Sequence, residues 1–150
     1  MCVCGVCVCL YTYICIYAHK SAIRCNLARR RIQGRGERLV RSMEHRLNEV
    51  RLATEHLPRR TASHLEWLAP IMGSGYWIAE LFDVANCEMV HGTKGGHCPT
   101  LSDPATLDEA DVLLLSPCGF SIQRTHYELK SLGLLEKWKN VRMIYMNVCM

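Results

Sequence analysis

Hydrophobic positions between residues 28 and 57 recur every three or four residues, which is the period of one helix face. The members of this stripe are Leu39, Val40, Met43, Leu47, Val50, Thr54 and Leu57. Arg, Glu, His and Asn fill most of the other positions, and Pro58 ends the pattern. A helix of about 20 residues is about 30 Å long. We therefore predict one long, basic, amphipathic helix over residues 27–60.

The rest of the chain, residues 61–150, alternates between strand-like and helix-like segments. Strands are predicted over residues 61–67, 88–91, 111–116 and 141–148, and helices over residues 76–85, 103–110 and 122–132. The run 111–116 is almost wholly apolar, as in a strand that is buried on both faces. Such alternation favours parallel strands with helices on both faces. The expected fold is α/β: a three-layer, Rossmann-like lobe with a mostly parallel sheet, preceded by the long helix.

Residues 1–26 differ from both of these segments. Met1–Tyr17 is apolar and uncharged, at the short limit for a membrane-spanning helix, and six of the ten cysteines lie in the first 25 residues. Three interpretations stay open: a low-complexity start foreign to the true chain, a targeting segment, and a thiolate metal cluster. A targeting segment would make the protein exported or membrane-associated, whereas a chain without one would be cytoplasmic.

Charge is distributed unevenly along the chain. Residues 1–60 hold 12 of the 18 Lys and Arg residues but 4 of the 14 Asp and Glu residues. The apolar fraction of 49% and the charged fraction of 21% exclude a wholly disordered or collagen-like protein. No Phe, Tyr or Trp lies between Ser21 and Ser63, so base stacking beside the arginines has no support. We expect a solvated helix face, no nucleic-acid partner and a monomer.

Two of the predicted strands end in segments with candidate chemistry. The segment Glu66–Trp77 combines two Trp and one Tyr with Pro70 and two glycines, and it leads into a helix. The segment Ser116–Phe120 follows the buried strand directly. In parallel α/β folds, ligands bind beyond the carboxyl ends of the strands. The two segments therefore predict a ligand site at one rim, with flat aromatic side chains as contact area.

Other chemistry is weakly supported by the sequence. Cys118 as a nucleophile would need a base, for which His126 is the nearest candidate in sequence. The spacing of Cys87, His91, His97 and Cys98 matches no zinc module, and residues 92–96 lack the P-loop spacing. We therefore assign no catalytic residue, no metal ligand and no catalytic cofactor.

The motifs also resemble a known family. The series Leu65–Pro70, followed by Gly75, Trp77, Glu80 and Leu81, looks like the C-terminal lobe of cobalamin-binding, periplasmic-type substrate-binding proteins, which serve cobalamin and iron-siderophore ABC importers. The segment Leu115–Phe120 with Arg124 and Thr125 is similar to the same family. In this helical-backbone class one long helix joins two lobes, and residues 28–57 stand in its place. The resemblance covers residues 28–148.

The resemblance implies a non-enzymatic protein that holds cobalamin, a related corrinoid or another large metal chelate such as an iron–siderophore complex. Ligand contacts are implied for both segments and for the loop that follows Gly96, at Glu66, Trp67, Gly75, Tyr76, Trp77, His97, Cys118, Gly119 and Phe120. Asp103 is implied as the acidic residue that docks on an ABC-transporter membrane subunit.

Two departures from the family pattern lead to further expectations. The residues before the long helix are too few for an N-terminal lobe, and the chain stops at Met150, where the family continues into a loop and a final helix. The lobe over residues 61–150 is thus expected to be truncated at its C-terminus. The alternatives are a small α/β thiol enzyme that uses Cys118, an interaction module with an Arg-rich helix, and a partial gene product.

Overall fold

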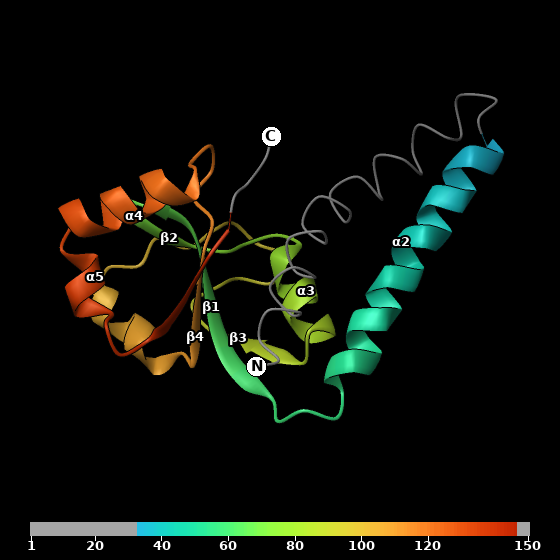
Figure 1. Cartoon of the computed structure of the whole chain (residues 1–150), viewed down its shortest axis with the longest axis horizontal. Coiled ribbons are helices and arrows are strands. Elements are labelled where there is room, and N and C mark those ends of the chain that lie inside the picture. The colour runs from blue at the N-terminus through green and yellow to red at the C-terminus, as the bar shows by residue number, and fades with distance from the viewer. Residues whose placement is uncertain (1–32, 147–150) are drawn as a thin grey trace. The chain divides into compact units, whose positions relative to one another are not determined.

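The computed structural model describes residues 33–146, drawn in colour in Figure 1. Residues 1–26, for which three interpretations were open, lie outside the described residues. So do the start of the predicted 27–60 segment and the last residues of the predicted 61–150 segment. Contacts divide the chain into two compact units. The first ends at Leu57 and also includes Val84–Asn86, and the second holds Pro58–Asp83 and the residues from Cys87 onward. None of the helices in residues 33–146 combines the length and apolar character that crossing a membrane requires.

The first unit contains the long helix α2, Gln33–Thr54. Val40, Met43, Val50 and Thr54 are buried, which confirms the predicted stripe along most of its length. Leu39 and Leu57 are 49% and 40% exposed, so their place in a buried stripe was predicted wrongly. Leu39 is about 100° around the helix from Val40, and Leu57 follows the helix end.

Asn86 stabilises the end of α2 within the first unit. Its Nδ2 donates hydrogen bonds to the carbonyl oxygens of Thr54 at 3.1 Å and Leu57 at 2.8 Å. The last carbonyl groups of a helix have no partner inside the helix. The side chain of Asn86 therefore replaces water at these two acceptors.

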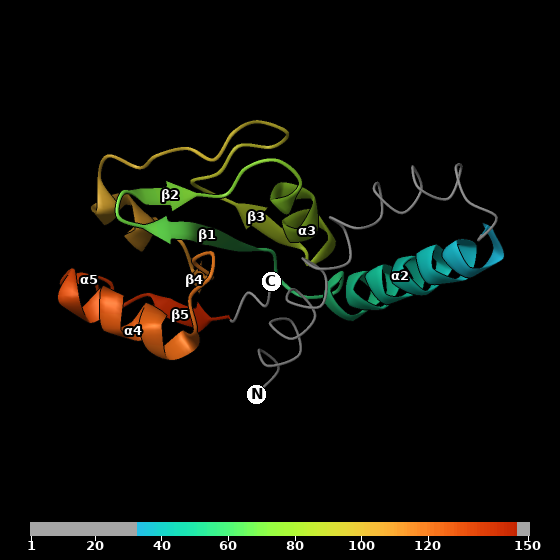
Figure 2. The same ribbon diagram turned by 90° about the horizontal axis from the view of Figure 1, so that it is seen from above.

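The second unit is built on a five-stranded sheet, shown in Figures 1 and 2. Its strands are β1 (Arg60–Leu68), β2 (Ile71–Gly73), β3 (Cys87–Met89), β4 (Val112–Leu115) and β5 (Arg142–Tyr145). The order is β2-β1-β4-β5, and β3 pairs with the start of β1. All pairs are parallel except β1 with β2, which confirms the mostly parallel sheet.

Helices cover both faces of this sheet. They are α3 (Ile78–Val84), α4 (Ile122–Ser131) and α5 (Leu134–Lys137), with the 3-10 helix η1 over Pro104–Glu109. Figures 1 and 2 show α3 on one side of the sheet and α4 with α5 on the other. The predicted helix at 103–110 is thus a short 3-10 helix, and Asp103 caps it. Strand β2 and helix α5 were not predicted.

The main core lies between the sheet and helices α4 and α5. Leu65, Leu113 and Leu115 project from β1 and β4 into this core and are fully buried. Leu129, Leu134 and Trp138 cover them from the helix side. Trp138 satisfies its one polar group, because Nε1 donates to the carbonyl of Pro104 at 3.0 Å. This packing holds the carboxyl ends of β1 and β4 in fixed register.

Candidate ligand site

The two predicted ligand segments lie side by side at the carboxyl ends of β1 and β4. These strands are parallel neighbours, with Leu65 opposite Leu115. Beyond the paired residues, the N–H of Ser116 donates to Leu65 O at 3.2 Å and that of Cys118 to Glu66 O at 3.3 Å. The backbone of one segment is therefore bonded directly to the other.

Trp67 and Phe120 contact each other across these two segments, and Arg124 of α4 lies against Phe120. The ring centroids of Trp67 and Phe120 are 5.3 Å apart, at an interplanar angle of 59°. The Arg124 guanidinium carbon lies 3.8 Å from the Phe120 centroid, within the range of a cation–π contact. Phe120 is buried, Trp67 is half-buried and Arg124 is exposed. The group is a rigid aromatic platform with one cation, and we call it the Trp67 platform.

Arg124 was part of a family-like motif but was not among the predicted contact residues. In the structure it lies beside the predicted contact residue Phe120. Its Nε lies 3.8 Å from Glu128 Oε1, one turn further along α4. Ser121 caps the same helix, with Oγ accepting from Arg124 N at 3.2 Å. The helix start therefore fixes where the guanidinium group lies.

Tyr76 and His97 form a second pair at the site. Tyr76 Oη and His97 Nδ1 are 2.5 Å apart, and the rings meet edge to face with centroids 5.3 Å apart. The backbone is also joined: Tyr76 N donates to Gly96 O at 2.7 Å, and Gly95 N donates to Tyr76 O at 2.9 Å. The structure thus brings Tyr76, which follows β2, against the loop over residues 92–100; this loop contains the predicted contact residue His97, and we call it the closing loop.

Glu66 connects the same closing loop to β1. The thiol of Cys98 donates to Glu66 Oε2 at 3.1 Å. Burial, and then the hydrogen bond and negative charge of Glu66, raise the pKa of Cys98 to about 11. The thiol is therefore protonated at neutral pH, the state in which it can donate this bond.

Gly75 lies where the chain has no room for a side chain. A Cβ at this position would be 2.6 Å from both Cys98 N and Gly96 O, and 2.7 Å from His97 C. All three are backbone atoms, so no side-chain rotation would relieve the overlap. Gly75 is buried and lets the closing loop approach the segment after β2, which is a spacing role.

Replacing Gly75 with alanine should push residues 96–98 away and lower the free energy of unfolding by about 1–3 kcal/mol. The displaced loop should also break the Cys98–Glu66 bond, so alkylation of Cys98, followed by mass spectrometry of its peptide, should become faster. Gly95 is the matched control, because a Cβ there meets nothing within 4 Å although its φ is +70°. Equal Cys98 alkylation in the two variants would contradict this account.

His64, a buried residue of β1, is hydrogen-bonded to both ligand segments. It was not among the residues predicted from the sequence. His64 is 3% exposed; its Nδ1 is hydrogen-bonded to Ser74 Oγ and its Nε2 to Ser116 Oγ. Ser74 lies near the end of the first segment and Ser116 at the start of the second, so one imidazole is bonded to both segments. The only signal in the sequence was a histidine in the middle of a predicted strand.

The hydrogen bonds also assign the tautomer of His64. Ser74 Oγ donates its one proton to His64 O at 3.2 Å, so it must accept the proton of Nδ1. Nε2 then carries the lone pair and accepts from Ser116. Burial lowers the pKa of His64 to about 4, which keeps the ring neutral. Ser116 and His64 are aligned like a nucleophile and its base, but both are 3% exposed, so a substrate could not reach them.

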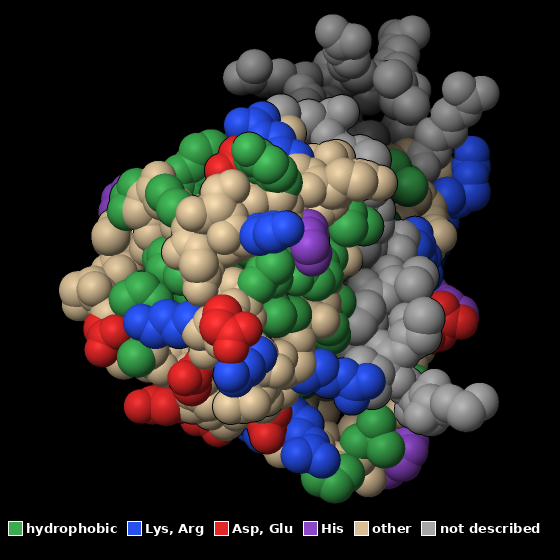
Figure 3. Space-filling model, turned by 60° about the vertical axis from the view of Figure 1, so that its left-hand side comes forward, with side chains coloured by type: hydrophobic (Ala, Val, Ile, Leu, Met, Phe, Trp, Pro, Cys, Tyr) green, Lys and Arg blue, Asp and Glu red, His purple; other side chains and the backbone are tan. Residues whose placement is uncertain are grey.

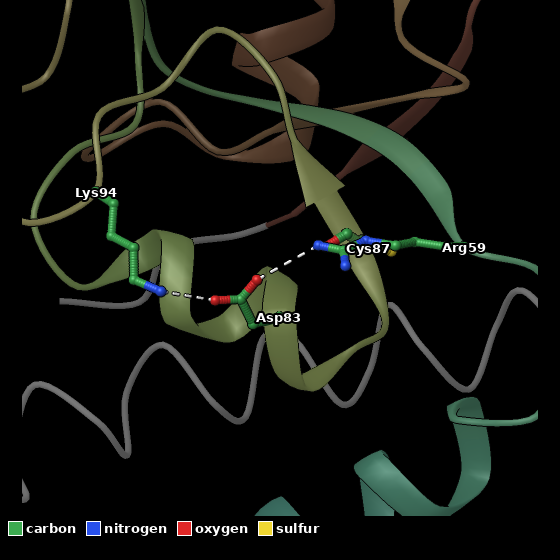
Figure 4. A network of polar contacts seen from close by, with 4 residues as sticks. All are labelled: Arg59, Asp83, Cys87 and Lys94. Atoms are coloured by element: carbon green, nitrogen blue, oxygen red, sulfur yellow. Dashed lines mark hydrogen bonds and ion pairs between the residues drawn. The ribbon is translucent and has the colours of Figure 1, made fainter.

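A polar network anchors the other end of the closing loop. Asp83 on α3 accepts from Lys94 Nζ at 2.9 Å and lies 3.6 Å from the Arg59 guanidinium, as Figure 4 shows. Arg59 also donates to Cys87 O at 3.4 Å. The hydrogen bond and charge of Asp83 raise the pKa of Lys94. One carboxylate therefore connects the loop, α3 and the entry to β1.

The remaining predicted residues lie at the surface or at helix starts. Cys118 and Gly119 are exposed, Gly119 has a φ of +73°, and Trp77 is half-buried. Asp103 is exposed, caps η1 through Ala105 N at 2.8 Å and lies 4.0 Å from Lys137 Nζ. Basic and acidic side chains are interspersed on the face seen in Figure 3.

The alternative thiol chemistry gains no support from the geometry. Within residues 33–146 no hydrogen bond joins Cys118 to His126, whose ring instead lies 6.1 Å from that of Tyr145. His126 lines a surface hollow of about 340 Å³ with Ile122, Gln123 and Tyr145. No three His, Cys, Asp or Glu residues in this part of the chain are placed to hold a metal ion.

Comparisons with known proteins agree with the fold. No protein-family model matches the chain, and no curated protein matches its sequence. Among solved structures, the chain is similar to the crystal structure of the periplasmic vitamin B12 binding protein BtuF of Vibrio cholerae, with a TM-score of 0.61 and 14% identity. The match covers 85% of this chain and 51% of that one, so the chain spans about half the length of this neighbour. At this identity the likeness shows the fold alone.

Proposed function

We propose that the second unit is a substrate-binding lobe for a cobalamin-type corrinoid in an ABC-type uptake system. The observation that carries the proposal is the Trp67 platform at the carboxyl ends of β1 and β4. A corrin ring is broad and flat, with apolar edges and polar amide arms. Aromatic faces offer contact area for such a ring at little entropic cost, while Arg124 and Tyr76 offer donors for the amides.

The fold supports the proposal but does not identify the ligand. The solved structure with the same fold is a vitamin B12 binding protein. Trp67 and Phe120 of the platform lie in the two segments that resemble the cobalamin-binding family. His97 lies on the loop for which the resemblance implies a further ligand contact. The proposed contact residues remain those predicted from the sequence, with Arg124 added and with Gly75 given a spacing role. Asp103 remains the proposed docking residue for a transporter subunit.

Replacing Trp67 with alanine should lower the affinity for cyanocobalamin at least about tenfold, or about 1.4 kcal/mol, because the largest face of the platform is lost. Affinity is measured by titration calorimetry up to about 1 mM ligand, which detects binding as weak as about −4 kcal/mol. Weak binding is expected, since pockets normally bury about 70–90% of a ligand and the chain spans about half the neighbour.

Tyr127→Ala is the matched control for this titration. Tyr127 is an aromatic residue of α4 that is 68% exposed and has no role in the proposed site. Its removal should leave the affinity unchanged. An unchanged affinity in Trp67→Ala would remove the platform from the site, and absence of binding by the unmodified chain up to the highest concentration would refute the proposed function.

A further inference from the structure

The Tyr76–His97 pair leaves one imidazole nitrogen available. Nδ1 of His97 is taken by the Tyr76 hydroxyl, and Nε2 has no hydrogen-bond partner among the described residues. Both side chains are exposed, with Tyr76 at 48%. When Nδ1–H donates to the tyrosine oxygen, Nε2 carries a lone pair that can bind a metal.

The backbone holds this pair at a conformational cost. Tyr76 has a φ of +54°, in the left-handed region that residues other than glycine rarely adopt. Left-handed backbone costs about 1–2 kcal/mol at such a residue. Burial does not offset this cost, because the tyrosine is largely exposed. Backbone strain of this kind is concentrated at sites that orient a functional group.

We propose that His97 Nε2 is an axial ligand to the metal of the bound chelate, and that Tyr76 is the positioning residue for its ring. The proposal rests on the proposed function and narrows its substrate class. Metal-binding histidines usually engage their second ring nitrogen with an acceptor, which fixes the ring and strengthens the ligand. In this protein the Tyr76 oxygen is the acceptor beside Nδ1 of His97.

The reaction implied is a ligand exchange without electron transfer. The Nε2 lone pair forms a bond to the metal as the bond from the metal to a water molecule breaks, and the water leaves. Because the chelate already supplies the equatorial ligands, one protein ligand is sufficient. This agrees with the absence of a three-residue metal site in residues 33–146. The substrate class is therefore a chelate with an exchangeable axial position, such as an aquocorrinoid, rather than a siderophore complex with a full coordination shell.

A comparison of aquocobalamin with cyanocobalamin distinguishes coordination of the metal by His97 from contact without coordination, because water on the metal exchanges readily and cyanide does not. Aquocobalamin should bind with a shift of its visible absorption bands at one equivalent, and at least about tenfold more tightly than cyanocobalamin. His97→Ala should abolish both the shift and the difference in affinity between the two cobalamins, because the other contacts of the site do not distinguish them. Tyr76→Phe removes the acceptor and should weaken aquocobalamin binding about tenfold, with a smaller shift.

His45→Ala is the control for coordination by any exposed histidine. His45 lies on α2 and is exposed, with Glu49 3.5 Å away. The band shift should persist in this variant. A shift that survives His97→Ala, or binding of both cobalamins without a shift, would overturn the inference and leave the proposed function intact. Failure of both cobalamins to bind would overturn the two together.

Discussion

Replacement of His64 with alanine should lower the free energy of unfolding of the second unit by about 3–5 kcal/mol, the upper range for core truncations. The variant removes a fully buried ring and leaves a cavity between β1 and the two ligand segments. It also deprives the Ser116 hydroxyl of its acceptor, and an unsatisfied buried hydroxyl costs about 1–3 kcal/mol. Urea denaturation followed by tryptophan fluorescence measures the loss.

The double variant His64→Ala, Ser116→Ala tests whether the hydrogen bond contributes as described. In this variant the unsatisfied hydroxyl is gone, so the double variant should be more stable than the sum of the two single losses predicts. We expect a coupling of about 1 kcal/mol, because residues in one hydrogen-bond network are not additive. Additive losses would mean that His64 acts through its volume alone.

Much of the fold could be predicted because the sequence pattern is local. The apolar run of β4 and the periodic faces of α2 and α4 are each visible within a short window. Strand β2 was missed, because its three residues fall inside a segment whose glycine and proline indicated a loop. Helix η1 was predicted as an α-helix, since its Asp103 cap and proline favour both helix types.

The site was less predictable because its contacts join distant parts of the chain. Tyr76 and His97 are 21 residues apart, and Cys98 and Glu66 are 32 apart. Neither spacing follows a helix or strand period. The Trp67–Phe120 contact could be expected from the parallel order of β1 and β4, since Trp67 lies near the end of β1 and Phe120 follows the end of β4 at the same rim. His64 could not, because a single histidine in a strand carries no pattern.

His64 also explains why the two ligand segments can be rigid without a disulfide or metal between them. Ser74 lies near the end of the first segment and Ser116 at the start of the second, and the same ring is bonded to both. Ser63, the residue before His64, donates a hydrogen bond to Val90 O at 3.1 Å. Its hydroxyl is also hydrogen-bonded to His91 Nδ1 at 2.8 Å. Two adjacent residues of β1 therefore connect both ligand segments with the residues that lead into the closing loop.

Acidification should destabilise the second unit between pH 6.5 and about 4, because His64 is neutral when folded. Its pKa falls from 6.5 to about 4 on burial, so in this range the unfolded chain binds a proton that the folded chain excludes. The contribution is complete above pH 6.5, declines as the pH falls towards 4, and amounts to about 3 kcal/mol. Hydrogen bonds from the backbone N–H and the hydroxyl of Thr61 lower the pKa of Asp111, so its contribution is lost as the pH falls further.

The comparison that isolates His64 is with His64→Gln. Glutamine does not titrate, and its amide can both accept and donate, so it can keep partners for Ser74 and Ser116. Urea unfolding at several pH values between 7 and 4 should show a stability loss in the unmodified chain that is about 3 kcal/mol larger than in this variant. The same pH dependence in both proteins would mean that the buried ring is charged or that the acid-sensitive group lies elsewhere. A larger loss in His64→Gln than in the unmodified chain would reverse the sign and refute the neutral ring, on which the connection between the two ligand segments depends.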